Sequence, residues 1–556
     1  MPTITLNKPV FDKLVGKTLP LDQLKDRISM LGTDLESIEN DQINVEIFPN
    51  RPDLLSEQGF ARAFSSFIGV KTGLRNYSAK PSKLKVIIDK SVTMRPYTAC
   101  AIVKNLKFDN EKIRELMQIQ EKLATTHGRN RKKSAYGIYP LNAINFPIHY
   151  TAKDPKTLRF QPLGFTYTIS ADQVLELHPK GKAYAHITKD WIKYPFFIDA
   201  KDNVMCMLPF TNSHTTGKVE TSTTEVFIEC SGTDLNNVMI ALNILTTSLI
   251  DMGGQAYSLN IVYPTKTITT PNLSPKKMKL DSNYINKLLG TTLEEKQFKH
   301  YLERMGYGYQ KNKQGITVLI PCYRNDILHQ ADLAEDIAIA YGYENFPELL
   351  PNAATIGQEN HLEQFTTKCR EILIGFDCLE IKNYHLSTLE DLNTKMSKTL
   401  PLITLKNALG DYNTLRNSLL PSSLKILTEN KHHEYTQRIF EIGRTFTTDK
   451  STDTGIAETE HLSLAIAHET ADFTEIRQHL DSFLATLNIS VQIKETTHPS
   501  FIPGRVAEIQ LNNHPIGLIG EFHPQVLTNW NLFMPTIAFE IDLEKLFEQI
   551  KKNTQK

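Results

Sequence analysis

Four acidic side chains crowd the start of one expected helix. The stretch "YRNDILHQADLAEDIAIAYGY" contains Asp326, Asp332, Glu335 and Asp336. The last three stand at i, i+3 and i+4, so a helix would present them on one face. Clustered carboxylate oxygens suit Mg²⁺ better than zinc. Helix capping is the alternative, because acids in a first turn are favoured by its free N–H groups.

A carboxylate and a hydroxyl stand two residues apart in "FIECSGTD", at Glu229 and Ser231. We expect a strand here, followed by a capped helix. Side chains two apart on a strand share one face, so this pair could form hydrogen bonds with a hydroxyl of a substrate. The alternative is structural: Thr233 or Asp234 caps the helix, and the pair before it has no further role.

A basic cluster follows another expected helix. In "HGRNRKKSAYG" it comprises Arg129, Arg131, Lys132 and Lys133. These residues could bind phosphates, since each neutralised phosphate releases counterions. Tyr136 and Tyr139, just beyond, could stack on unpaired bases. A solvated loop is the alternative interpretation.

The common catalytic motifs are absent from the sequence. It contains no GxxxxGK[ST], GxSxG or HExxH, and no GxGxxG after a strand. His498, Arg505 and His523 lie in "HPSFIPGRVAEI" and "GEFHP" without neighbours that would complete a nucleophilic triad or a metal site.

Composition indicates an ordinary globular protein of several domains. A chain of 556 residues has room for roughly three to five domains of ~100–200 residues. Lys+Arg and Asp+Glu are equal at 62 each, so any RNA contact needs a local patch. The six cysteines are scattered without a CxxC pair, which favours reduced thiols. We find neither a signal-peptide run nor about 20 successive apolar residues, and expect a cytoplasmic protein that does not enter membranes.

Strand and helix patterns alternate along the chain. A stripe of Phe60, Phe64 and Phe67 predicts one core helix, and the spacing of "NEKIRELMQIQEKLATT" predicts another. "TDLNNVMIALNILTTSLIDMGG" predicts an apolar helix with an Asp or Thr cap. We expect linkers at "SAKPSKLKV" and "NFPELLPNAATIGQ".

Several stretches then converge on one family. They are "EIFPNRPDLLSEQGFAR", "HPKGKAYAHI", "FIECSGTD", "PCYRNDILHQADLAEDIAIAYGYENF", "TLRNSLLPSSL", "RIFEIGRTF" and "GEFHP" with "AFEIDL". Together they closely resemble the β subunit of phenylalanyl-tRNA synthetase, in the short form found in archaea, eukaryotes and some bacteria. The matches run in order from about residue 40 to 545.

The resemblance implies an α+β multidomain fold. It implies an N-terminal α/β domain at 1–85, a mixed α/β editing domain at 86–265 and a small winged-helix-like domain at 268–348. A class II synthetase-like antiparallel sheet with helices, catalytically inactive, would occupy 358–550. The long bacterial form carries an inserted OB domain and a C-terminal anticodon-binding domain, neither of which fits this length.

The resemblance also implies a division of labour. Attachment of phenylalanine to tRNAPhe with ATP would take place on a separate α subunit, in an α2β2 heterotetramer. The sequence agrees, because it lacks the class II glycine-rich stretch that ends in an ATP-binding arginine. By resemblance, the Mg²⁺ ligands are Asp326, Asp332, Glu335 and Asp336.

The β subunit of this family also hydrolyses misacylated Tyr-tRNAPhe. By resemblance, Glu229 and Ser231 belong to the editing site, and Cys206 and Phe197 line it. Cys206 departs from the serine usual there, and a thiol is a poorer hydrogen-bond partner. Two alternatives therefore stay open: an assembly or tRNA-binding scaffold with a vestigial editing site, and a free-standing trans-editing hydrolase.

Overall fold

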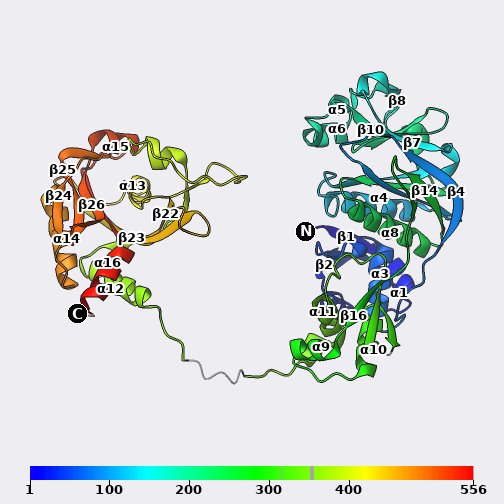
Figure 1. Ribbon diagram of the computed structural model, residues 1–556, viewed down its shortest axis with the longest axis horizontal. Helices are drawn as coiled ribbons and strands as arrows, with labels where there is room; N and C mark the ends of the chain where they lie inside the picture. The colour runs from blue at the N-terminus through cyan, green and yellow to red at the C-terminus, as the bar shows by residue number, and fades with distance from the viewer. Residues whose placement is uncertain (313–314, 351–355, 555–556) are drawn as a thin grey trace. The chain divides into compact units, whose positions relative to one another are not determined.

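The computed structural model describes residues 1–312, 315–350 and 356–554. The chain packs as two compact units, 1–350 and 351–556 (Figure 1). Both mix helices with sheets, so the predicted α+β class is confirmed at this level. The finer domain boundaries given above stay predictions. Of the linker expected at 345–358, residues 351–355 lie outside the described part of the chain.

The first unit opens with a three-stranded antiparallel sheet in the order β1-β3-β2 and three helices. The elements are β1 (Thr3–Asn7), α1 (Lys8–Val15), α2 (Leu21–Met30), β2 (Asp34–Glu39), β3 (Gln42–Glu46) and α3 (Glu57–Phe67). The predicted Phe60, Phe64 and Phe67 stripe is buried on α3. Phe60 and Phe64 both contact Phe11 of α1, which confirms this core helix.

A mixed ten-stranded sheet dominates the first unit. Its order is β12-β11-β10-β7-β4-β14-β5-β13-β6, with β15 on β14. The strands are β4 (Ala79–Ile88), β5 (Tyr97–Lys104), β6 (Ser134–Pro140), β7 (Ile148–Lys153), β10 (Tyr194–Ile198), β11 (Val204–Met207), β12 (Thr211–Asn212), β13 (Val226–Gly232), β14 (Gln255–Val262) and β15 (Thr267–Thr270). The linker expected at "SAKPSKLKV" was wrong: these residues enter β4, which pairs in parallel with β14 and β7.

Helices α4 (Asn110–Thr125) and α8 (Leu235–Asp251) pack beside this sheet. Asp234 caps α8 by accepting a hydrogen bond from the Asn237 N–H at 2.7 Å, as the sequence predicted. Helix α8 contacts β5 and β13 of the sheet and also α3 (Figure 1). Its apolar side chains therefore join the large sheet and the N-terminal elements in one continuous core.

Short elements complete this part of the first unit: β8 (Arg159–Phe160), β9 (Ile169–Ser170), α5 (Val174–Leu177), α6 (Pro179–Tyr184) and α7 (His214–Gly217). A second three-stranded sheet follows, in the order β16-β18-β17. Its elements are β16 (Lys276–Leu280), α9 (Ser282–Leu289), α10 (Glu295–Arg304), β17 (Gly308–Asn312), β18 (Gly315–Ile320) and α11 (Gln330–Tyr341). Its buried side chains belong to the same core as α8.

The second unit is built on a seven-stranded sheet in the order β19-β22-β23-β27-β26-β25-β24. All its pairs are antiparallel except β19 with β22. The main elements are α12 (His361–Gly375), β19 (Leu379–Glu380), β20 (Leu386–Ser387), β21 (Thr414–Leu415), α13 (Leu420–Glu429), β22 (Gln437–Thr448), β23 (Ile456–Ala467), α14 (Phe473–Thr486), β24 (Gln492–Glu495), β25 (Phe501–Leu511), β26 (His514–Phe522), α15 (Pro524–Asn529), β27 (Thr536–Asp542) and α16 (Leu543–Thr554). Helices α12, α14 and α16 cover one face, and α13 and α15 the other.

All six cysteines are buried and unpaired. Four lie in the first unit, and Cys369 and Cys378 in the second. Through the described ranges, we find no helix with both the length and the apolar character needed to cross a membrane.

Candidate functional site

Strand β13 carries both residues predicted for the editing site. It lies between β5 and β6, deep in the large sheet. Val226, Ile228 and Cys230 belong to the core that includes α8, whereas Phe227 belongs to the apolar cluster on the opposite face. Glu229 and Ser231 alternate with the first set, so they share the face of Phe227. Both side chains are fully buried.

The same face collects the other two predicted residues. Phe197 of β10 and Cys206 of β11 are register partners on neighbouring strands, and both lie in the apolar cluster with Phe227. The ring of Tyr150 stacks on Phe197 with centroids 4.5 Å apart. Burial, and then the charge of Glu229, raise the pKa of the Cys206 thiol. The structure therefore brings the four predicted editing residues to one place.

Burial dominates the electrostatics of Glu229. It raises the pKa of this carboxyl to about 8, although the Arg95 guanidinium and the Tyr139 hydroxyl both act to lower it. Arg95 is itself fully buried and donates hydrogen bonds to the Ser231 carbonyl at 2.8 Å and the Arg131 carbonyl at 3.0 Å. A carboxyl with this pKa is largely protonated at neutral pH.

Two buried oxygens at this site have no hydrogen-bond partner within the described residues. They are Glu229 Oε2 and Ser231 Oγ. A buried polar atom without a partner costs about 1–3 kcal/mol, so native structures rarely keep one without a reason. A ligand hydroxyl bound between these atoms would remove that cost.

A pocket of about 760 Å³ is connected to this group through Asn212, although none of the four predicted editing residues lines it. Its walls come from α4, from Ala135, Tyr136 and Ile138 of β6, and from residues 208–212. Arg131, His178, Lys180 and Lys218 contribute basic side chains to the lining. Asn212 connects pocket and acid, because it lines the pocket and accepts a hydrogen bond from the Tyr139 hydroxyl, which also contacts Glu229.

Sequence reasoning missed the roles of Arg95, Asn212 and Gly137. Gly137 lies opposite Glu229 in the β6–β13 register, and an added Cβ would come within 2.6 Å of Glu229 Oε1. The expectation that Tyr139 could stack on bases was wrong, because its side chain is fully buried. The alternation of "SAYGIYP" was an available signal, since it assigns Ala135, Gly137 and Tyr139 to one strand face.

The predicted basic cluster divides into two kinds of residue. Its loop takes a left-handed backbone at Arg129, Asn130 and Arg131, with φ of 49°, 52° and 63°. Arg131 turns toward the pocket, where it pairs with Glu121 at 2.9 Å and donates to the Pro209 carbonyl at 3.1 Å. Arg129 and Lys132 are exposed, and Lys133 is half-buried. RNA contact by this cluster stays a prediction that only its exposed members could fulfil.

The four predicted magnesium ligands differ in their contacts and in their exposure. Asp326 and Asp336 both pair with the buried Arg324 guanidinium, at 2.6 Å and 2.8 Å. Asp332 caps α11 by accepting hydrogen bonds from two backbone N–H groups at 2.7 Å, as the capping alternative expected, and Glu335 is exposed. Over the described ranges no group of three His, Cys, Asp or Glu side chains is arranged to hold a metal ion. The donors do not fit an ion in this arrangement, and the magnesium site stays a prediction.

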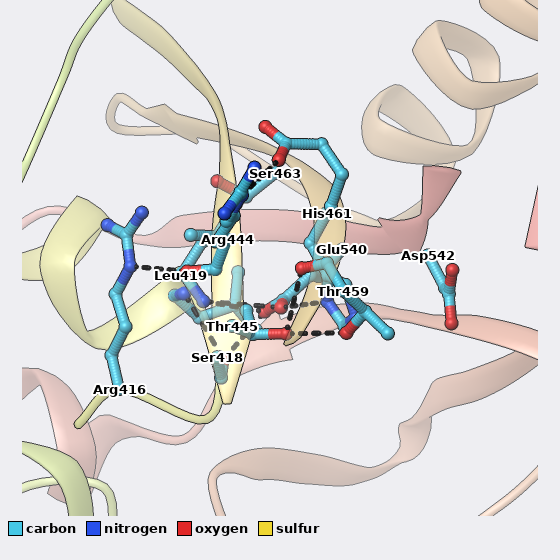
Figure 2. A network of polar contacts seen from close by, with 12 residues as sticks. Arg416, Ser418, Leu419, Arg444, Thr445, Thr459, His461, Ser463, Glu540 and Asp542 are labelled. Atoms are coloured by element: carbon cyan, nitrogen blue, oxygen red, sulfur yellow. Dashed lines mark hydrogen bonds and ion pairs between the residues drawn. The ribbon is translucent and has the colours of Figure 1, made fainter. Parts of the chain in front are cut away.

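The sheet of the second unit carries a polar network on the face that α13 covers (Figure 2). His461 Nδ1 lies 2.7 Å from Glu540 Oε1, and Glu540 Oε2 accepts a hydrogen bond from Ser418 Oγ at 2.6 Å. Thr445 and Thr459 hydroxyls lie 3.0 Å apart on the adjoining strands. Arg505 is exposed and pairs with Glu521 at 2.7 Å. The network is extensively hydrogen-bonded, as expected of a structural core.

Comparison with known proteins identifies the chain's relatives. A family model described as "Phenylalanyl tRNA synthetase beta chain CLM domain" matches residues 346–543, and one described as "tRNA synthetase B5 domain" matches residues 278–343. The phenylalanine–tRNA ligase beta subunit of Pyrococcus abyssi is 37% identical over 558 residues, covering 99% of this chain and 100% of that protein. The Archaeoglobus fulgidus subunit is 38% identical and covers 99% of both chains.

A solved structure agrees with these relatives. It is the crystal structure of an N-terminal fragment of the phenylalanyl-tRNA synthetase beta subunit from Pyrococcus horikoshii, with a TM-score of 0.59 and 36% identity. The match covers 62% of this chain and 100% of the fragment. The sequence agrees over nearly the whole chain and the fold over 62% of it, so the chain belongs to the phenylalanine–tRNA ligase beta-subunit family.

Proposed function

We propose that this chain is a β subunit that is non-catalytic in aminoacylation, supports charging of tRNAPhe and hydrolyses Tyr-tRNAPhe on its large sheet. One observation carries the editing proposal: Glu229 Oε2 and Ser231 Oγ are buried, lack hydrogen-bond partners in the described structure, and lie on one face beside Cys206 and Phe197. A cluster of apolar side chains that contains two unused polar atoms is suited to a phenol, which has an apolar ring and one hydroxyl.

Proofreading has a physical reason. A hydrophobic pocket built for phenylalanine cannot strongly reject an analogue that merely adds a hydroxyl, and the limit is about 10². A second site can instead prefer tyrosine over phenylalanine, because there the hydroxyl of tyrosine satisfies buried polar groups that phenylalanine would leave unpaired. Water would then attack the ester carbonyl, the acyl–oxygen bond would break, and tyrosine and tRNAPhe would leave. Glu229 and Ser231 would recognise the hydroxyl, and Phe197 and Cys206 would pack around the ring.

The proposal includes the rest of the assembly. ATP and phenylalanine would bind a separate α subunit, and two copies of each chain would form an α2β2 heterotetramer. The second unit would be the inactive class II-like domain, at 358–550, and 268–348 the winged-helix-like domain. A magnesium ion and a cytoplasmic location remain predictions.

The test uses the complex of this chain with its α subunit. We expect it to release tyrosine from Tyr-tRNAPhe faster than buffer alone, and to spare Phe-tRNAPhe. The double variant Glu229→Ala, Ser231→Ala should lose this activity and still support phenylalanylation. Deacylation that survives the double variant would refute the site.

Two other outcomes would favour the alternatives. A wild-type complex that charges tRNA but never deacylates Tyr-tRNAPhe would indicate a scaffold with a vestigial site, which the Cys206 thiol favours. A chain that purifies alone and deacylates without the α subunit would indicate a trans-editing hydrolase.

A further inference from the structure

We propose that Tyr139, held by Asn212, is a positioning residue that fixes Glu229 for recognition of the substrate's hydroxyl. This inference rests on the proposed editing function and extends it to two residues outside the predicted set. Tyr139 would set the direction of the carboxylate and reserve one of its oxygens for the substrate.

The geometry forms a short relay between pocket and acid. The Tyr139 hydroxyl lies 3.1 Å from Asn212 Oδ1 and 3.3 Å from Glu229 Oε1. Tyr139 and Glu229 are fully buried, whereas Asn212 is half-buried and lines the pocket. Gly137 keeps the space open, because a Cβ there would collide with both the Tyr139 hydroxyl and Glu229 Oε1.

A proton count explains how the relay works. A phenol carries one proton, so Tyr139 can donate to Glu229 or to Asn212 but not fully to both. When Glu229 is ionised, Tyr139 donates to Oε1, and the Asn212 amide turns its NH₂ toward the phenol oxygen. Amide orientation is interchangeable in this way because the two ends have the same shape. The relay therefore has a consistent arrangement with an ionised Glu229.

That arrangement leaves Glu229 Oε2 for the ligand. Oε1 is engaged by Tyr139, whereas Oε2 has no partner among the described residues. A tyrosyl group can donate its hydroxyl proton to Oε2, and a phenylalanyl group cannot. Hydrogen bonds to an ionised acceptor are roughly twice as strong as neutral ones, so ionised Glu229 should discriminate best.

The pH dependence of deacylation should follow the ionisation of Glu229, whose pKa depends on its ionisable neighbours. Those whose charges interact with it are Arg95, Cys100, Tyr139, Tyr150, Cys206 and Cys230. Burial raises the pKa of Glu229 to about 8, and Arg95 and Tyr139 oppose this rise. Loss of the Tyr139 hydroxyl should therefore raise the pKa of Glu229 further.

The experiment compares wild-type and Tyr139→Phe complexes with the α subunit. We expect kcat/KM for Tyr-tRNAPhe deacylation to rise with pH around 8 in the wild type, after subtraction of the uncatalysed rate. Tyr139→Phe should lower kcat/KM by about ten-fold or more, since hydrogen bonds to charged groups are strong. It should also move the midpoint of the pH profile upward. Tyr194→Phe is the matched control, a buried tyrosine of β10 in a separate apolar cluster.

Phenylalanylation by the same complexes reports whether each variant folds and assembles. If Tyr139→Phe fails to fold, Asn212→Ala carries the test, because it removes the pocket-side partner from a half-buried position. A wild-type complex that deacylates while Tyr139→Phe shows the same kcat/KM and midpoint would overturn only this inference. A wild-type complex without deacylation would overturn the proposed function and this inference with it.

Discussion

Arg416 and Glu441 form an ion pair in which both side chains are fully buried, with Nη1 and Oε1 2.7 Å apart. The pair joins the stretch "TLRNSLLPSSL", which contains Arg416, to the stretch "RIFEIGRTF", which contains Glu441. Figure 2 shows Arg416. Arg416 also donates from Nε to the Arg444 carbonyl at 2.8 Å. A Cβ at Gly443 would collide with Arg416 Nη2, so that glycine makes room for the guanidinium.

Removal of one partner should strongly destabilise the second unit. We expect Arg416→Met to lower its free energy of unfolding by about 3–5 kcal/mol, because Glu441 would be left buried without its partner of opposite charge. The matched control is Arg477→Ala, which breaks the more exposed pair with Asp481 on α14 and should cost at most about 1 kcal/mol. Denaturant unfolding of the full chain measures both. Equal losses would show that burial of the pair is unimportant.

The His461–Glu540 pair should stabilise the second unit within a limited pH window. Burial opposes both charges, yet Glu540 raises the pKa of His461, and His461 lowers the pKa of Glu540. The stabilisation is therefore lost as pH falls below the ordinary Glu value near 4.5 and as pH rises through the raised His461 value above 6.5. His461→Gln should cost more stability at pH 5.5 than at pH 9. A cost independent of pH would contradict a charged pair.

Glu229 should destabilise the first unit as pH rises. Its folded pKa is about 8 against an ordinary value of 4.5, so the folded state holds the proton more tightly, and stability falls between these pH values. Each pKa unit corresponds to about 1.4 kcal/mol, so Glu229→Gln should gain a few kcal/mol over wild type at pH 9 and little at pH 4. Thermal melting at both pH values measures this. Glu225→Gln, a partly exposed control just before β13, should show no such trend.

Magnesium binding can be tested at Glu335. Because this side chain is exposed, Glu335→Gln should leave the melting temperature nearly unchanged. If the predicted site exists, calorimetric titration after EDTA treatment should show one Mg²⁺ bound per chain. Glu335→Gln should then abolish this binding. No binding in the wild type, together with strong destabilisation by Arg324→Met, would instead assign Asp326 and Asp336 to the guanidinium alone.

If the exposed residues of the basic cluster bind tRNA, they should contribute to the salt dependence of tRNA binding. Replacing Arg129 and Lys132 by Ala should weaken tRNA binding by the complex and flatten its salt dependence, since each phosphate contact contributes a slope of about 0.7–0.9. Arg131 should be left in place, because its side chain holds the pocket wall. Binding measured from 50 to 200 mM salt tests this. An unchanged slope would leave the cluster as a solvated loop.

Local patterns predicted much of this structure. The cap at Asp234, the stripe on α3 and the shared face of Glu229 and Ser231 all follow from spacing along a single element. Strand β4 was missed because its Lys, Ser and Pro residues resemble a linker, and only its pairing with β14 and β7 makes it a strand.

The rest depends on contacts between distant residues. Tyr139 contacts Glu229 across 90 positions, and Arg95 reaches the Ser231 carbonyl across 136. Spacing placed three acids on one face of α11, but it could not predict that Arg324 would neutralise two of the four carboxylates. Sheet register and the pairing of buried charges depend on contacts throughout the fold, and local patterns in one sequence do not predict such contacts.

The reactivity of the six buried thiols can report which unit of the chain unfolds. A native molecule should resist alkylating reagents at all six cysteines, because each one is covered. When one unit opens, only its own cysteines become reactive: Cys369 and Cys378 for the second unit, and the remaining four for the first. Mass spectrometry of briefly alkylated protein would then count two, four or six added groups. The masses would tell which half of the chain opens first under stress, without any added probe.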